Sequence, residues 1–148
     1  MVKRTCSKNV PRHRASQYRK VAESLWATAR DLVDLTREES GYGNAIGILV
    51  VHSAIAWTDA LTIAYDGRKH TGSKHVRAAD LLLEAVGDAH VDVDKRKKLE
   101  TILQAKDEVS YMGEYYTEER AHTLFTEMRA YRRWARGAWD KRPPAGRR

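Results

Sequence analysis

Residues 41–65 read GYGNAIGILVVHSAIAWTDALTIAY, and this stretch decides the fold of the chain. From Asn44 to Trp57 it holds no charged residue, and its aliphatic side chains fall on every side of a helix. A helix that is apolar all round lies either in a protein core or in a membrane. Two polar residues interrupt it, His52 and Asp59, which are seven positions apart and therefore nearly on one helical face.

The composition of this stretch favours a core helix over about residues 44–65. A membrane-spanning helix needs about 20 predominantly apolar residues, whereas His52, Asp59 and three glycines fall inside that length. No apolar segment follows the basic N-terminus, so no secretory signal is expected. The lone Cys6 excludes a disulfide framework and a cysteine-built zinc site. We therefore expect a cytoplasmic protein without membrane, metal or cofactor.

The charge of the chain is concentrated at its two ends. Residues 1–20 hold seven Lys or Arg and no acid, and residues 129–148 hold eight and a single acid, Asp140. Each end therefore carries +7 and the remainder −7, within a net charge of +7. Basic ends on an acidic body favour a polyanionic partner, nucleic acid first, although solvated tails that aid solubility give the same pattern.

The rest of the chain predicts four more helices and no strand. Three-and-four apolar spacing marks residues 15–36, and Ser73 and Thr117 are suitable N-caps for the third and fifth helices. Asp92 or Asp94 starts the fourth, and Gly67 ends the central helix. The prediction is an all-α, up-and-down bundle of five helices. It has a flexible basic arm over 1–13, one domain over 14–139 and a disordered basic tail over 140–148.

Strict alternation of five helices has a geometric consequence. An odd number of alternating helices starts at one end of the bundle and finishes at the other. The two basic ends are therefore expected at opposite poles of a monomer.

Three groups of residues are candidates for chemistry. Arg68 and His75 have the R-x6-H spacing of a cation and an acid–base group, a plausible ribonuclease pair, although a basic chain produces such spacings by chance. His52 and Asp59 form a ligand pair or a polar contact between helices. A denser group could line a nucleotide pocket or simply cover a helix junction: Lys106, Glu108, Tyr111 and Tyr115.

Three segments together resemble HEPN domains, the higher-eukaryote and prokaryote nucleotide-binding helical fold. They are NAIGILVVHSAIAWTDALTIAYDG, GSKHVRAADLL and KDEVSYMGEYYTEERAHTLFTEMRAYRRW, and the similarity covers about residues 16–136. The resemblance implies a helical bundle that forms homodimers and acts near RNA or nucleotides. It also implies a partner such as a nucleotidyltransferase or an antitoxin. Catalytic members place the Arg and His of R-x4-6-H before the last helix, where this chain has Lys106 and Tyr111.

The leading hypothesis is therefore a non-catalytic, HEPN-like protein that dimerises and binds a nucleotide, RNA or a partner protein. Its ligand would contact Lys106, Glu108, Tyr111 and Tyr115, with His52 and Asp59 as a polar stripe that reaches them. Two alternatives stay open: a toxin- or defence-type endoribonuclease that needs no metal, and a purely structural interaction module.

Overall fold

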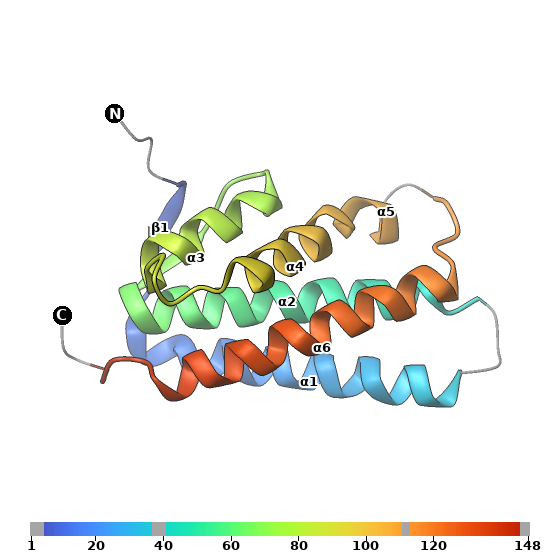
Figure 1. Ribbon diagram of the computed structural model, residues 1–148, viewed down its shortest axis with the longest axis horizontal. Helices are drawn as coiled ribbons and strands as arrows, with labels where there is room; N and C mark the ends of the chain where they lie inside the picture. Colours follow the sequence, from blue (N-terminus) through green and yellow to red (C-terminus); the bar gives the residue numbers. More distant parts are fainter. Residues whose placement is uncertain (1–4, 37–40, 111–112, 146–148) are drawn as a thin grey trace.

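The computed structural model describes residues 5–36, 41–110 and 113–145, which form a bundle of α-helices (Figure 1). The elements in chain order are β1 (Ser7–Asn9), the 3-10 turn η1 (Arg12–Arg14), α1 (Ala15–Leu35), α2 (Gly43–Asp66), β2 (Arg68–His70), the 3-10 turn η2 (His75–Arg77), α3 (Ala78–Val86), α4 (Val93–Gln104), α5 (Lys106–Ser110) and α6 (Glu118–Asp140). The predicted all-α fold is confirmed. The predicted fourth helix is interrupted at Ala105 and continues as the short α5.

Helix α2 lies at the centre of the bundle and contacts α1, α3, α4, α5 and α6 (Figure 1). It is long and apolar enough to span a membrane by composition, but 78% of its most apolar window is buried by the other helices. Ile46, Val50, Val51 and Leu61 are fully buried. Each such side chain contributes about 1.5–3 kcal/mol before the entropy of ordering is subtracted. The interpretation of this stretch as a core helix is confirmed.

The predicted starts of α4 and α6 are confirmed by their hydrogen bonds, whereas Ser73 does not cap α3, which follows Arg77. The Asp92 carboxylate accepts from the backbone N–H of Asp94, and the Thr117 hydroxyl accepts from that of Arg120. Both bonds satisfy a donor that the first turn of a helix leaves unpaired. Gly67 ends α2 with a φ of 65°, a left-handed conformation that glycine adopts without strain.

Asn44 does not cap α2, which begins one residue earlier at Gly43. Its side-chain amide instead donates to the carbonyl oxygens of Val109 and Glu114, and its oxygen accepts from the N–H of Tyr116. These three bonds fasten the start of α2 to the connection between α5 and α6. The close approach requires glycine, because a Cβ on Gly43 would lie 1.7 Å from the carbonyl oxygen of Tyr116.

The prediction that no strand forms is wrong for two three-residue segments. β1 pairs antiparallel with β2, and Ser7 lies opposite His70. Thr5 extends the contact, since its hydroxyl and its N–H both donate to the Glu84 carboxylate of α3. Residues 5–14 therefore lie against the bundle instead of forming a free arm. The segments SKN and RKH lack alternating apolar residues, which is why their pairing leaves no signal in the sequence.

Strand β2 also changes the direction of the next helix. It carries the chain back along α2 before α3 begins, so α3 runs in the same direction as α2 (Figure 1). Contacts along α3 agree with this direction. His75 lies near Lys106 beyond the end of α4, and Asp80 pairs with Arg96 near the start of α4. The assumption of strict alternation is therefore wrong.

The two basic ends of the chain consequently lie at the same pole of the bundle. The start of α1 and the end of α6 lie side by side there (Figure 1). The Arg12 guanidinium donates to the carbonyl oxygen of Pro143 at 3.0 Å and to that of Ala64 at 2.8 Å. The expectation of opposite poles is wrong. It assumed that the chain crosses the length of the bundle five times, but β2 adds a further crossing.

Candidate functional site

The pole shared by the two chain ends is called the basic pole here. It carries the cations Arg12, Arg19 and Arg142 and the ring of Trp139. Trp139 in this region is 9% exposed and has two guanidinium groups near its indole ring. The Arg142 guanidinium carbon lies 4.1 Å from the indole centroid and that of Arg19 lies 5.4 Å from it. Both distances suit cation–π attraction. The arginines are thereby held in place while their charge remains.

A groove of about 1060 Å³ runs across the basic pole. Its lining residues come from the N-terminal segment, from the end of α2 with β2, and from the C-terminal segment: Asn9, Val10, Pro11, Arg12, His13, Tyr65, Asp66, Gly67, Arg68, Pro143 and Ala145. The groove exists because the two chain ends flank the end of α2. Arg12 spans it and bonds to both walls.

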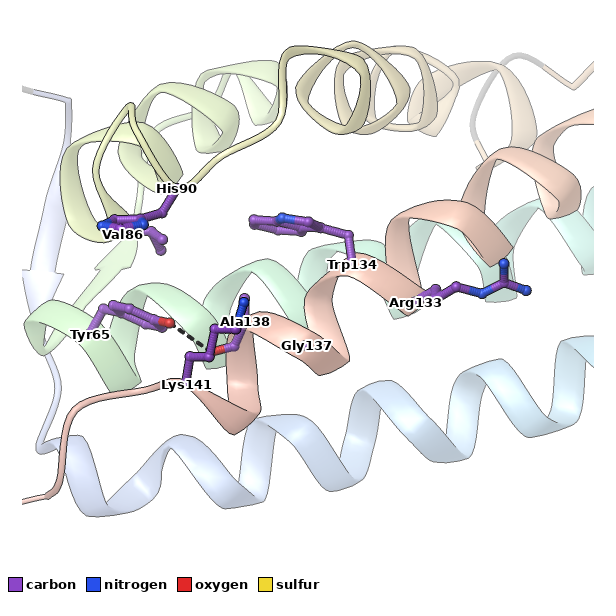
Figure 2. Close-up of a pocket in the computed structure, with 8 residues that line it drawn as sticks. All are labelled: Tyr65, Val86, His90, Arg133, Trp134, Gly137, Ala138 and Lys141. Atoms are coloured by element: carbon purple, nitrogen blue, oxygen red, sulfur yellow. Dashed lines mark hydrogen bonds between the residues drawn. The ribbon is translucent and has the colours of Figure 1, made fainter.

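A smaller pocket of about 330 Å³ adjoins the groove and shares Tyr65 with it. It lies between α6 and the connection from α3 to α4, and Figure 2 shows its lining residues: Tyr65, Val86, His90, Arg133, Trp134, Gly137, Ala138 and Lys141. Trp134, Tyr65 and His90 surround the opening. Lys141 lies beside Tyr65 and Ala138, whereas Arg133 lies on the far side of Trp134.

Two contacts fix the walls of this pocket. The Tyr65 hydroxyl donates to the Ala138 carbonyl oxygen at 2.6 Å, which ties α2 to the last turns of α6. Burial raises the pKa of Tyr65, so this donor stays protonated. The Trp134 indole packs against the buried Tyr131 ring with centroids 5.7 Å apart. One side of the indole is therefore supported by the core.

Gly137 forms an open part of the pocket wall. It lies within α6, where glycine is less favourable than alanine by about 0.5–1 kcal/mol. A Cβ at this position would meet nothing within 4 Å, so packing does not require glycine. The effect of its missing side chain is to leave the pocket open.

Arg68 and His75, the alternative catalytic pair, have separate surroundings. The Arg68 guanidinium pairs with Asp66 at 3.1 Å and Glu84 at 3.0 Å, and donates to the Ser7 hydroxyl. Burial opposes ionisation of Arg68, but these two carboxylates raise its pKa. No contact joins Arg68 to His75 within the described residues. Arg68 thus holds β2 to β1 and α3.

His75 lies instead near two of the predicted ligand-binding residues, His52 and Lys106. Partial burial, followed by the charges of Lys106 and His75, lowers the pKa of His52. Partial burial and then Lys106 lower the pKa of His75, against the nearby Asp107. The sequence predicted His52 with Lys106, and the structure adds His75. Both imidazoles favour the neutral form and could accept hydrogen bonds beside a cation.

Asp59 lies on the other part of the predicted stripe and is 7% exposed. Desolvation raises its pKa to about 7, although Lys69 and Lys8 act in the opposite direction. His52 keeps an exposed side chain despite its partial burial, whereas Asp59 is buried, so the two residues do not form one polar surface. Asp59 lies near Lys8 of β1 and Lys69 of β2. His52 lies near His75 of η2 and Lys106 of α5.

Glu108 and Tyr115 lie at the far end of the bundle from the basic pole. Glu108 pairs with Arg120 at 2.6 Å, and the Tyr115 hydroxyl donates to the Glu118 carboxylate. That carboxylate also accepts from the backbone N–H groups of Gly41 and Tyr42, so this cluster fastens the connections on either side of the bundle end. Tyr111 lies outside the described residues. Lys106 lies near His52 and His75, whereas Glu108 and Tyr115 contact Arg120 and Glu118. The described residues of the predicted pocket therefore lie in separate groups.

The two cavities at the basic pole were not predicted from the sequence. Charge at both ends was the available signal, but the cavities depend on the ends meeting. Gly137, inside a helix rich in Arg and Trp, was a second signal. Within the described ranges, no group of three or more His, Cys, Asp or Glu side chains could hold a metal ion.

No protein-family model matches the chain, and no curated protein or solved structure matches it.

Proposed function

We propose that this chain is a non-catalytic, HEPN-like cytoplasmic protein that binds single-stranded RNA through its basic pole. The observation that carries the proposal is the meeting of both basic ends around two adjoining cavities lined by Tyr65 and Trp134. Cations that follow a phosphate backbone, with rings that stack on bases, are the usual means of binding single strands. The acidic remainder of the chain directs a polyanion to this pole.

The ribonuclease alternative is less favoured by the geometry. Its arginine, Arg68, has a side chain only 10% exposed that is paired with two carboxylates. A guanidinium neutralised in this way offers little charge to a phosphoryl transition state. At the position of the catalytic pair in the family, Lys106 and Tyr111 supply neither arginine nor histidine.

The proposal predicts RNA binding that weakens steeply with salt. Fluorescence anisotropy with a labelled single-stranded RNA should give a linear fall of log affinity with log salt concentration. The Arg14→Glu, Lys141→Glu double variant should bind at least about tenfold more weakly, because it reverses two exposed charges of the basic pole.

The matched control is the Arg30→Glu, Lys97→Glu double variant, which makes the same charge change at exposed positions outside both cavities. It should retain most of the affinity. Equal losses in both double variants would show that only net charge matters. The RNA should also be recovered intact. Cleavage that disappears in His75→Ala would replace the binding proposal with the ribonuclease alternative.

The proposal includes a homodimer, and exposed apolar side chains on α1 and α2 are its candidate contact. Val21, Leu35 and Ile48 are 52%, 78% and 37% exposed. An Ile48→Glu variant should sediment as a monomer where the natural chain sediments as a dimer, because a buried, unpaired carboxylate opposes association. Val93→Glu, on the exposed side of α4, is the control and should leave the dimer intact. A monomeric natural chain would remove this part of the proposal.

A further inference from the structure

We propose that the pocket between α6 and the α3–α4 connection binds one nucleotide, with its base against Trp134 and its phosphate on Lys141. This inference rests on the proposed RNA binding and assigns it a specific subsite. The adjoining groove would then hold the neighbouring part of the strand, since the two cavities share Tyr65.

The size and lining of the pocket suit a flat ring. Its volume of about 330 Å³ lies at the small end of ligand pockets. The Trp134 indole is half-buried and supported by Tyr131 on its core side, so it is already oriented before a ligand arrives. Stacking on a fixed indole is tolerant of base identity, because every base has a π-face. Figure 2 shows the indole and His90 at the same opening.

The charge of the lining residues favours a phosphate. The eight described lining residues include two cations, Arg133 and Lys141, and no carboxylate. Neither cation forms an ion pair within the part of the chain that the structure describes. The neighbouring Arg132 differs, since it makes two bonds to the Glu23 carboxylate at 2.7 and 2.8 Å. Lys141 lies nearer the opening than Arg133 (Figure 2) and is therefore the assigned phosphate contact.

Gly137 supplies an independent argument for an occupied pocket. Packing does not exclude a side chain there, because an added Cβ would meet nothing within 4 Å. Helix propensity favours almost any other residue at this position. Gly137 lies between Trp134 and Lys141, so its missing side chain leaves the space between these two residues open (Figure 2).

The test is a nuclear magnetic resonance titration with adenosine monophosphate, adenosine and inorganic phosphate in separate arms. The indole N–H resonance of Trp134, assigned by its absence from a Trp134→Phe spectrum, is the reporter. Adenosine monophosphate should shift this resonance saturably. Adenosine and phosphate should each do so roughly tenfold more weakly, because each lacks one of the two contacts. A response to phosphate alone that equals the response to the nucleotide would overturn the assignment of a base.

Two pairs of variants locate the ligand. Gly137→Leu fills the opening and should weaken nucleotide binding at least about tenfold, whereas Gly137→Ala should change it less than about threefold. Lys141→Ala should weaken it comparably, and Lys97→Ala should not. Thermal melts confirm folding. If Gly137→Leu fails to fold, the comparison of Lys141→Ala with Lys97→Ala tests the proposal in its place. Unchanged binding in Gly137→Leu or Lys141→Ala would overturn the proposal, as would an unresponsive Trp134.

The same variants separate this inference from the proposed function. If Gly137→Leu binds RNA as tightly as the natural chain and Trp134 ignores the nucleotide, the subsite is overturned while RNA binding stands. If the natural chain binds no RNA but Trp134 responds and Gly137→Leu abolishes the response, the proposed function fails and the nucleotide pocket is supported.

Discussion

The Asp59→Asn substitution is expected to stabilise the protein at pH 8 by up to about 4 kcal/mol and to leave its stability at pH 4 nearly unchanged. Asp59 is 7% exposed, and desolvation raises its pKa from 3.8 to about 7. Between these values the folded chain holds a proton that the unfolded chain has released. Stability of the natural chain therefore falls as the pH rises from about 4 to 7 and is level above that window. Asparagine stays neutral at every pH, so the Asp59→Asn variant does not lose stability through this group.

Urea unfolding of both proteins between pH 4 and 8 measures this effect. Burial lowers the pKa of His52, His70 and His75, so these groups destabilise the folded chain as the pH falls below their ordinary value. The three histidines affect both proteins alike, so their effect largely cancels when the free energies of unfolding of the two proteins are subtracted. Asp34→Asn, at an exposed position of α1, controls for the loss of one charge. Parallel curves for the natural chain and Asp59→Asn would contradict the prediction.

The same substitution at two glycines is expected to have opposite effects. Gly43→Ala should destabilise the protein by about 3 kcal/mol, at the upper end of the range for overpacking. Its Cβ would lie 1.7 Å from the Tyr116 carbonyl oxygen, and backbone cannot rotate away as a side chain does. Moving Tyr116 would also break its bond to the Asn44 side chain. Gly137→Ala should instead stabilise by about 0.5–1 kcal/mol.

Thermal and chemical unfolding of these two variants form a matched pair. Both add one methyl group, so hydrophobicity and composition are equal and only the surroundings differ. An intermediate variant is Gly47→Ala, whose Cβ would lie 2.5 Å from a methyl carbon of Val109. It should fall between the two, because a side chain can yield further than a backbone carbonyl. A stable Gly43→Ala protein would show that the α5–α6 connection moves freely.

The sequence predicts most of the helices because their signals are local. An uncharged run from Asn44 to Trp57 is incompatible with a surface helix, and the Asp92 and Thr117 side chains cap the helices that follow them. Such signals depend on neighbours within one or two turns. They are consequently present in the sequence whatever the rest of the chain does.

The path of the chain between helices was not predictable in the same way. The pairing of Ser7 with His70 joins residues that are distant in sequence, and it is made by backbone groups that every residue carries. A count of crossings that omits β2 places the end of α6 at the wrong pole. The basic pole is formed by both chain ends, so it can be predicted only when the direction of every helix is known.

The predicted polar residues show a related limit. His52 and Lys106 do lie near each other, because α5 packs on α2. Glu108 and Tyr115 are predicted ligand-binding groups, and the structure pairs them with Arg120 and Glu118. The sequence contains the carboxylates and cations without their pairing. Only the structure distinguishes a charge that is neutralised from one that remains available.

Arg12 is ordered in a different way from Arg68. Its guanidinium is held by the carbonyl oxygens of Ala64 and Pro143, which are neutral acceptors, whereas the guanidinium of Arg68 is held by two carboxylates. Both side chains are therefore ordered by their contacts. The rotamer of Arg12 is thus selected before a ligand enters the groove that this side chain lines. Preorganisation of this kind reduces the entropy lost on binding, and an equally charged but mobile lysine at residue 12 would lack this advantage.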